Sequence, residues 1–234
     1  MLTKKKQIFY NTLYRLQNSL FYIFAKQSYS QEGEDLILSR IFGKKKDGFF
    51  VDVGAFHPKR FSNTYLFYKR GWRGINIEAN PKSIKHFYKV RKRDINLNIP
   101  VSDKPDILKY YIFNEPALNG FSKELSSQRN GQGKYIIVKE LEMQTQRLDE
   151  ILTKHLPPDT NIDFMSIDVE GLDYQVLVSN DWKKFRPSIL LVEELGFNIE
   201  KPESSKTHLF LKENNYSLYG KSVNTIIYRD NNYC

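Results

Sequence analysis

The sequence predicts an α/β fold with a mostly parallel β-sheet that carries helices on both faces. Short apolar runs with strand character alternate along the chain with segments of helical periodicity, which is the order that parallel strands and crossover helices produce. Of the 234 residues, 40% are hydrophobic and 14% are aromatic, enough to bury one substantial core. We therefore expect one domain over 29–234, preceded by an N-terminal extension over 1–28.

The elements of the first half follow from local patterns. An acid-rich first turn within Ser30–Asp35 precedes the apolar residues of 36–42 and predicts a short helix. Pro81 suits the first position of another helix. Further on, we expect strands at 48–53, 74–77 and 95–101, and helices at 62–69 and 81–92.

The second half is expected to continue this alternation and to close with two antiparallel strands within 216–219 and 224–228. Between Asn114 and Gly133 the chain is rich in Asn, Gly, Ser and Gln, which predicts a long mobile loop. Loops of that length in compact domains often bind or cover ligands, so a role facing the substrate is expected. The other predicted elements are strands at 110–113, 135–138, 162–167 and 188–192, and helices at 147–155, 173–179 and ending near 214.

The extension has the pattern of an amphipathic helix. Its polar residues interrupt any run long enough to cross a bilayer, and no small-residue cleavage site follows it. We expect it to pack on the domain or in a homodimer interface, with peripheral contact at an anionic membrane surface as the alternative. The apolar residues at three- and four-residue spacing are Phe9, Leu13, Leu16, Leu20, Phe21 and Phe24.

Charge and cysteine content restrict the partners. Five basic residues precede the first acid, Glu32, so the net charge of +9 falls to +4 for the rest of the chain. The only cysteine, Cys234, leaves no internal disulfide and suits a cytoplasmic location, at the inner membrane face if the extension binds lipid. One predicted helix carries a basic cluster that is typical of a solvated face, so no nucleic-acid partner is expected, although an anionic glycan or lipid-linked substrate would suit it. The cluster comprises Lys82, Lys85, Lys89, Arg91, Lys92 and Arg93.

Two acid-tipped strands carry the main functional signal. Asp52 and Gly54 end one apolar run, and Glu78 ends the next strand 26 residues after Asp52. The carboxyl ends of neighbouring parallel strands meet at one edge, where a carboxylate can chelate ribose hydroxyls. No further glycine follows at 55–58, whereas a dinucleotide loop needs several to approach a pyrophosphate. S-adenosylmethionine, with an adenosine and a sulfonium but no phosphate, fits this pattern.

A third strand, at 162–167, leads to Asp168 and Glu170. Residues two apart on an extended chain can point the same way, so both carboxylates are expected at the cleft, with capping of the next helix as the alternative. Carboxylates there would stabilise a sulfonium, and oxygen ligands could also hold a divalent metal, although the sequence shows no full ligand set. His57 is a candidate general base, or else a turn histidine bound to the backbone.

Several short segments, taken in order, resemble the FkbM family of S-adenosylmethionine-dependent methyltransferases. The resemblance runs from about Tyr29 to Tyr228, and the order of the segments makes it specific. Pro58 departs from the family, which commonly places another glycine there. The segments are Ser30–Asp35, Val51–Ala55, Ser62–Thr64, Gly71–Gly74, Ile77–Pro81, Asp168–Gly171 and Pro187–Glu193.

This resemblance implies a class I methyltransferase fold, a Rossmann-like seven-stranded sheet. It also implies an O-methyltransferase that acts on a hydroxyl of a sugar in a surface polysaccharide or related glycan, or of a small molecule, with Asp168, Glu170 or His57 as proton acceptor. The rival interpretations are a non-catalytic partner protein with the same fold, and a nicotinamide-dependent sugar oxidoreductase, which the missing glycines disfavour. The resemblance implies cofactor contacts from Asp52, Gly54 and Ala55 around the methionine part, from Glu78 at the ribose, and from Ser102 or Asp103 at adenine. The further cofactor-binding candidates are Ala79, Asn80 and Asp168.

Overall fold

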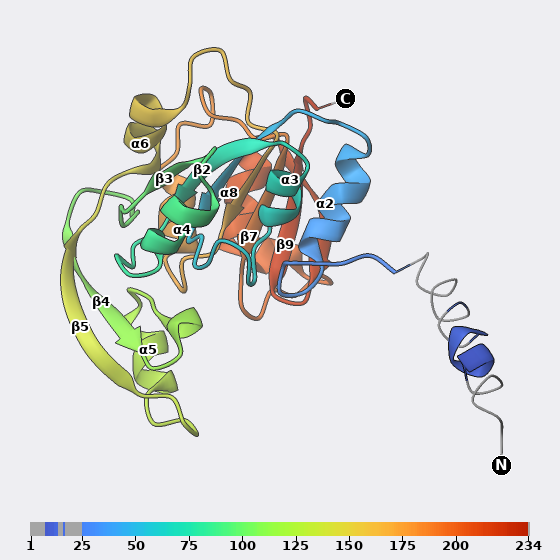
Figure 1. The fold of residues 1–234 in the computed structure, drawn as a ribbon. Helices are drawn as coiled ribbons and strands as arrows, with labels where there is room; N and C mark the ends of the chain where they lie inside the picture. The colour runs from blue at the N-terminus through green and yellow to red at the C-terminus, as the bar shows by residue number, and fades with distance from the viewer. Residues whose placement is uncertain (1–7, 14–15, 17–24, 234) are drawn as a thin grey trace.

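The computed structural model describes residues 8–13, 16 and 25–233. Its centre is a seven-stranded sheet in the order β3-β2-β1-β6-β7-β9-β8, so the predicted fold class is confirmed (Figure 1). Five of these strands run parallel, and the last two close the sheet as an antiparallel pair. The strands are β1 (Phe49–Val53), β2 (Arg73–Ile77), β3 (Ile95–Leu97), β6 (Phe164–Ile167), β7 (Ile189–Glu193), β8 (Tyr216–Ser222) and β9 (Thr225–Asp230).

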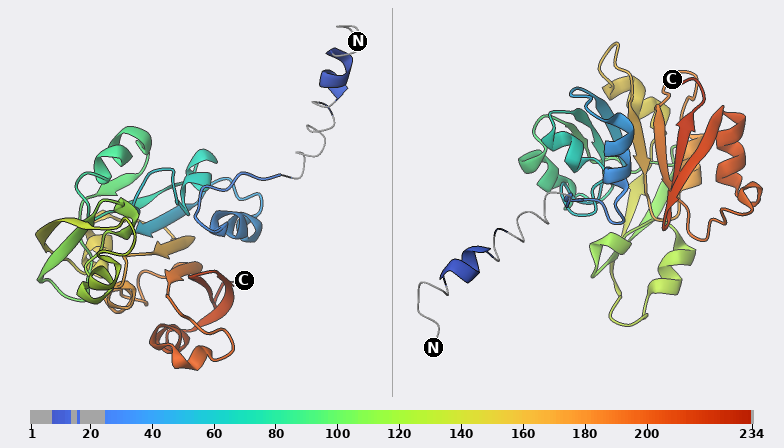
Figure 2. Two further views of the ribbon diagram at one scale, coloured as in Figure 1. Left: turned by 90° about the horizontal axis from the view of Figure 1, so that it is seen from below. Right: turned by 90° about the vertical axis from the view of Figure 1, so that its right-hand side faces the viewer.

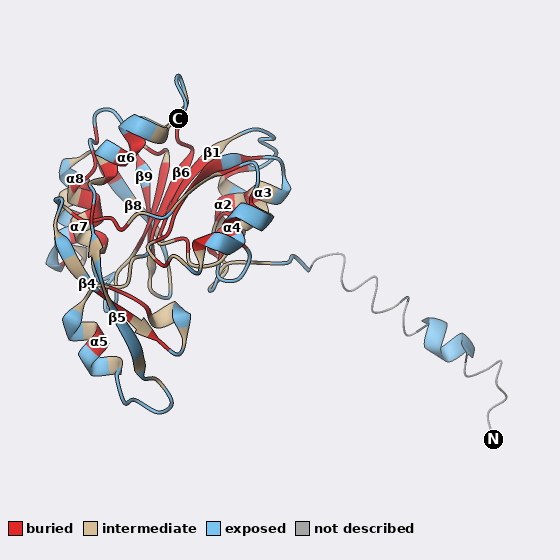
Figure 3. Ribbon diagram, turned by 60° about the vertical axis from the view of Figure 1, so that its left-hand side comes forward, coloured by how far each residue is buried: buried red, intermediate tan, exposed pale blue. Residues whose placement is uncertain are grey.

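Helices cover both faces of the sheet, and its central strands β1, β2, β6 and β7 are almost entirely buried (Figure 3). On one face, Leu38, Phe67 and Trp72 pack against Phe50 and Phe164 of the sheet. On the other face, apolar side chains of α6, α7 and α8 form a larger core with the opposite sides of the same strands. The helices are α2 (Glu34–Phe42), α3 (Tyr65–Lys69), α4 (Ile84–Val90), α6 (Leu148–His155), α7 (Asp173–Val178) and α8 (Lys206–Glu213), with a 3-10 turn η3 (Pro202–Ser204) before α8.

The strand order reverses beside β1. From β1 the chain moves outward to β2 and β3, and it then returns to the other side of β1 with β6 and β7. Adjacent loops therefore leave in opposite directions at the carboxyl ends of β1 and β6, which is where open parallel sheets form ligand crevices.

A separate lobe interrupts the alternation. Here β4 (Ile107–Phe113) and β5 (Ile137–Gln144) pair antiparallel in a sheet of their own, outside the main sheet. Between them lie η2 (Pro116–Leu118) and α5 (Lys123–Arg129), so the prediction of a structureless loop over 114–133 is wrong. The Ser122 hydroxyl accepts the amide of Leu125 and caps α5, which stabilises a helix too short to show clear periodicity. The lobe projects from the sheet (Figures 1 and 2).

Two further expectations change. The strand predicted at 95–101 ends at Leu97, because the Asn98 side chain turns to the carbonyl groups of Glu78 and Ala79. Arg91 does not belong to a solvated face, since its side chain is fully buried and paired with Asp94. The other members of that basic cluster are exposed.

The described part of the N-terminal extension is helical over 8–13. Its apolar side chains are exposed, with Ile8, Phe9 and Tyr10 each at least 60% accessible. The remaining apolar positions of the predicted stripe, from 20 to 24, lie outside the described residues. Among the helices that are described, none is both long and apolar enough to pass through a bilayer.

Candidate functional site

A pocket opens at the carboxyl ends of β1, β2 and β6, where the strand order reverses. Its floor includes the strand residues Val53 and Ile77, and three carboxylates reach it, those of Glu78, Asp168 and Glu170. Among the described residues that line it, there is no lysine, arginine or histidine. The pocket is therefore acidic and partly apolar.

Gly54 brings two strand ends together. Its φ of +84° lies in the left-handed region, and a Cβ built there would lie 1.7 Å from the backbone oxygen of Asp168. The amides of Gly54 and Ala55 also donate to the carbonyl of Ile77, at 2.9 and 3.1 Å. Only glycine satisfies both the torsion angle and the close approach, so this position fixes the pocket floor.

Glu78 is 6% exposed at the pocket wall. One carboxylate oxygen accepts the amide of Phe56 and the other accepts the amide of Asn80, both at 2.6 Å. Burial raises the pKa of Glu78 to about 7, against the lowering effect of the two amides. Each oxygen can still accept another hydrogen bond, so the carboxylate keeps acceptor capacity on the pocket side.

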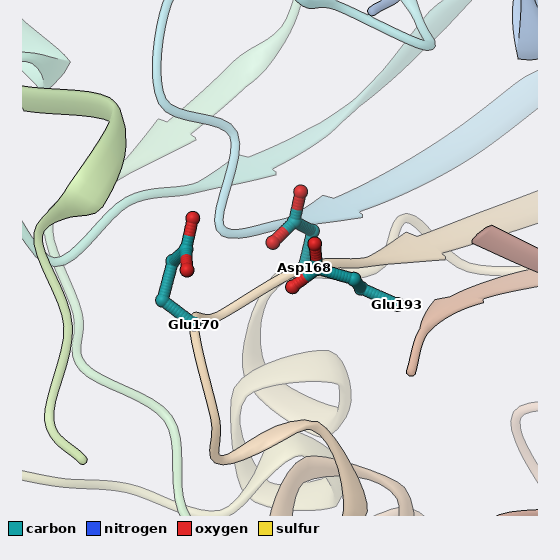
Figure 4. Close-up of side chains that lie close together, drawn as sticks. All are labelled: Asp168, Glu170 and Glu193. Carbon is teal, nitrogen blue, oxygen red and sulfur yellow. The ribbon is translucent and has the colours of Figure 1, made fainter. Parts of the chain in front are cut away.

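Two of the pocket carboxylates, with a further one, form a cluster where β6 and β7 end. Asp168, Glu170 and Glu193 each place an oxygen within 4.8 Å of the others, and Asp168 and Glu193 reach the same point from neighbouring strands (Figure 4). Asp168 is accessible because it lines the open pocket, although protein surrounds it on its other sides. The sequence did not lead us to predict Glu193 as a site residue. Its position at the end of β7, a fourth parallel strand with an acid at its carboxyl end, could have indicated it.

These carboxylates differ in their bonding. Glu170 pairs with Arg129 of α5 at 2.6 Å, which leaves it partly neutralised. Burial and the nearby acids Glu170 and Asp173 raise the pKa of Glu193 to about 8. Burial and Glu193 likewise raise the pKa of Asp168 well above its usual range. Both shifts favour the protonated form, so the Asp168–Glu193 pair holds at least one proton near neutral pH. Oxygen ligands of this kind could also contact a hard cation, but three carboxylates form only part of its usual shell.

Comparison with known proteins identifies the family. The model described as Methyltransferase FkbM domain matches residues 52–218 of this chain. The chain belongs to the FkbM methyltransferase family. Among solved structures it is similar to methyltransferase FkbM from Methylobacillus flagellatus KT, with 11% sequence identity and a TM-score of 0.49 over 86% of this chain. The alignment covers 48% of that protein, so the chain spans about half its length. The comparison with curated proteins gave no match.

Membership of the FkbM family confirms the resemblance found in the sequence and supports a methyltransferase. The structure places five of the predicted site residues around the pocket. It places the other predicted residues outside the described lining, where each has a partner within the protein. Those that line the pocket are Gly54, Glu78, Ala79, Asp168 and Glu170, and those that do not are Asp52, Ala55, His57, Asn80, Ser102 and Asp103.

Asp52 belongs to a buried polar layer below the FkbM-family pocket. It accepts the hydroxyl of Thr64 at 2.9 Å and lies in register with Asn76 of β2 and Ser166 of β6. Burial raises its pKa to about 6, and the charge of Arg91 opposes that shift. Asp52 thus connects the sheet to the Ser62–Thr64 segment through the hydroxyl of Thr64.

His57 caps its own turn. Its Nδ1 accepts the amides of Lys59 and Arg60, at 3.1 and 2.9 Å, and burial lowers its pKa with help from His86 and these two basic neighbours. This is the bonding expected of a turn histidine. To act as a base from this position, His57 would have to leave those two amides.

The other four predicted contacts are held by the protein as well. Ala55 packs in a small apolar cluster behind the first turn. The Asn80 side chain accepts the amide of Lys82 and starts the turn before α4. Ser102 donates to the carboxylate of Asp103, while the neighbouring Val101 lines the pocket.

The lobe completes the pocket wall in this FkbM-family chain. Tyr110 and Phe121 line it with their rings 4.7 Å apart, and Asn119 lies between them in sequence. Two ion pairs tie the lobe to the strand turns on either side, Arg129 with Glu170, and Arg60 with Glu115 at 3.6 Å. Part of the 114–133 region lines the pocket, and the role of this region in facing the substrate stays a prediction.

Proposed function

We propose that this chain transfers a methyl group from S-adenosylmethionine to a hydroxyl oxygen, on a sugar of a polysaccharide or related glycan. The observation that supports this donor is the acidic pocket at the strand reversal, lined by Glu78, Asp168 and Glu170 without a cationic side chain among the described residues. A phosphorylated cofactor would meet repulsion there, whereas a cationic one is stabilised. The same feature speaks against a nicotinamide dinucleotide.

The residues present fit this donor. Glu78 would accept the two ribose hydroxyls, because its carboxylate is already held by two backbone amides. Ile77, Ile99 and Val101 offer an apolar wall for the adenine. When bound, S-adenosylmethionine supplies an electrophilic methyl group on a positively charged sulfur. The acids at the end of β6 would face that charge.

The acceptor hydroxyl must lose a proton as it reacts. Glu170 is engaged by Arg129, so the Asp168–Glu193 pair, when it holds a single proton, is the better proton acceptor. A singly protonated pair keeps one carboxylate to take the hydroxyl proton, and its raised pKa makes that carboxylate a stronger base than a free one. Holding the hydroxyl in line with the donor would supply much of the rate through placement. The sugar as acceptor rests on the family resemblance described above.

Calorimetry tests the donor. We expect S-adenosylhomocysteine to bind and reduced nicotinamide dinucleotide not to bind. The Glu78→Ala variant should lose about 1 to 3 kcal/mol of binding free energy, because the ribose hydroxyls lose a buried acceptor. Glu142→Ala, exposed on β5, is the control. Equal dissociation constants for wild type and Glu78→Ala would remove Glu78 from the site, and absence of binding would reject the donor.

A cytoplasmic location also remains our proposal, because the single cysteine suits a reducing compartment. We keep two roles open for the extension, homodimer contact and attachment to the inner membrane face, and propose no nucleic-acid partner.

A further inference from the structure

A second pocket lies on the other side of the loop that follows β6. The loop Asp168–Gly171 forms the wall between the two, since its first three residues line the first pocket and Gly171 lines the second. The second pocket is bounded by the start of α7, by the segment after β7 and by the start of α8. Apart from Glu193, its lining residues have no role in the site described above.

The two pockets meet at the carboxylate pair. Asp168 lines the first pocket and Glu193 lines the second, and their carboxylate oxygens lie within 4.8 Å of each other. A proton acceptor can therefore be reached from both sides of the wall. For the methyl group to transfer, the acceptor oxygen itself must lie in line with the methyl carbon in the first pocket, at about 3 to 3.5 Å, so the second pocket would hold a neighbouring part of the acceptor whose hydroxyl reaches past the carboxylate pair.

We infer that the second pocket holds the acceptor, and that the part of the acceptor bound there is neutral or positively charged. This inference rests on the proposed methyl transfer and adds to it the acceptor subsite and its chemical class. Tyr174 and Leu195 supply apolar surface to this pocket, and Glu193, Glu194 and Thr207 supply polar atoms. This mixture suits a ring that carries hydroxyl groups.

The charges in this pocket set the class of ligand. Asp173 is occupied by the amides of Val169 and Gly171, at 3.0 and 3.1 Å. Glu193 and Glu194 remain on the wall, with Lys206 as the one basic residue among the described lining residues. The ammonium of Lys206 lies 4.3 Å from the ring centroid of Tyr174. The single ammonium of Lys206 shares this pocket with the carboxylate of Glu194, and the partly protonated Asp168–Glu193 pair lies at its wall, so the described lining has no surplus positive charge for a uronate, sulfate or phosphate on the bound segment. The exposed lysines on α4 would not select the ligand at this point.

Protection of introduced cysteines from maleimide labelling shows which of the two pockets a ligand occupies. In a Cys234→Ser background, which removes the only cysteine, Leu195→Cys reports on the second pocket and Ala117→Cys on the first. S-adenosylhomocysteine should slow maleimide labelling of the Ala117→Cys variant and leave the Leu195→Cys variant unchanged. A glycan fraction that accepts a radiolabelled methyl group should slow labelling of the Leu195→Cys variant, by about ten-fold at ten times its dissociation constant.

The fractions come from envelope glycans of the organism, separated on an anion exchanger. The radiolabelled methyl group should enter the fraction that does not bind the anion exchanger, which contains neutral glycans and glycans with amino sugars. Tyr174→Ala should raise the half-saturating concentration of that fraction and leave the dissociation constant of S-adenosylhomocysteine unchanged, while Tyr88→Ala, exposed on α4, should change neither.

The outcomes distinguish the two proposals. If no fraction accepts label, the methyl transfer to a glycan is rejected, and the acceptor subsite with it. If a fraction accepts label but protects only the Ala117→Cys variant, or if the label enters only the strongly anionic fraction, the subsite inference is wrong and the methyl transfer stands.

Discussion

Replacing Glu193 with glutamine should stabilise the protein at alkaline pH. Glutamine resembles the protonated acid in shape, and it removes one negative charge from the pair with Asp168. Burial raises the pKa of Glu193 from an ordinary 4.5 to about 8 in the folded chain. The folded protein therefore binds this proton more tightly than the unfolded chain does, and the unfolding free energy falls as the pH rises through this interval.

The magnitude follows from the shift. Each pKa unit corresponds to about 1.4 kcal/mol, so the part of the shift that lies between pH 5 and pH 8 corresponds to roughly 3.5 kcal/mol. Because Asp168 shares the proton, we expect Glu193→Gln to be more stable than wild type by about 2 to 4 kcal/mol at pH 8, and by less than about 1 kcal/mol at pH 5. Asp52, Glu78 and Asp173 also have raised pKa values, but they are present in both proteins and cancel in the difference.

Urea unfolding at pH 5, 6.5 and 8 measures this difference. The two tryptophans, Trp72 and Trp182, are both buried and report the transition by fluorescence. Glu142→Gln on β5 is exposed and should follow the wild type within about 0.5 kcal/mol at each pH. The reasoning is refuted if Glu193→Gln is less stable than wild type at pH 8, or if the two proteins show the same pH dependence.

Three further predictions concern other parts of the chain. Gly54→Ala should lower the free energy of unfolding in urea by more than about 3 kcal/mol, because the added methyl group would clash with the turn after β6. Gly131 has a similar φ of +85° with open space around it, so Gly131→Ala should lower the free energy of unfolding by only about 1 to 2 kcal/mol. Equal losses in the two variants would contradict the packing argument. Arg91→Met should lose about 3 to 5 kcal/mol, since it leaves Asp94 buried without its partner, and a loss below about 1 kcal/mol would show that the pair is dispensable. Deletion of residues 1–27 should abolish sedimentation with anionic liposomes if the extension binds membranes, and unchanged sedimentation would exclude that role.

The order of the elements and the centre of the site could be predicted because their signals are local. The turn at Gly54 and the acid at Glu78 each follow an apolar strand, and parallel strands bring such tips to one edge. The predicted antiparallel pair at the end of the chain is confirmed for the same reason, since the alternation is visible within each strand.

The features that escaped prediction depend on contacts between distant segments. The pairing of β4 with β5 spans a helical segment whose short pieces lack periodicity. In sequence, Arg91 cannot be distinguished from its exposed basic neighbours. Its burial depends on Asp94 and Thr64, which the fold brings into contact with it. Asp52 carries the expected residue type, but its carboxylate is engaged by Thr64, which only the fold brings near.

The lobe supplies a side chain to each pocket, Phe121 to the first and Leu125 to the second, from adjoining positions before and within α5. A ligand that displaced this segment from one pocket would also move a side chain that lines the other. The affinities of the two ligands are then linked, and the factor by which the first changes the second equals the factor by which the second changes the first. In steady-state kinetics, this linkage would appear as ordered binding, with the donor before the acceptor or the reverse.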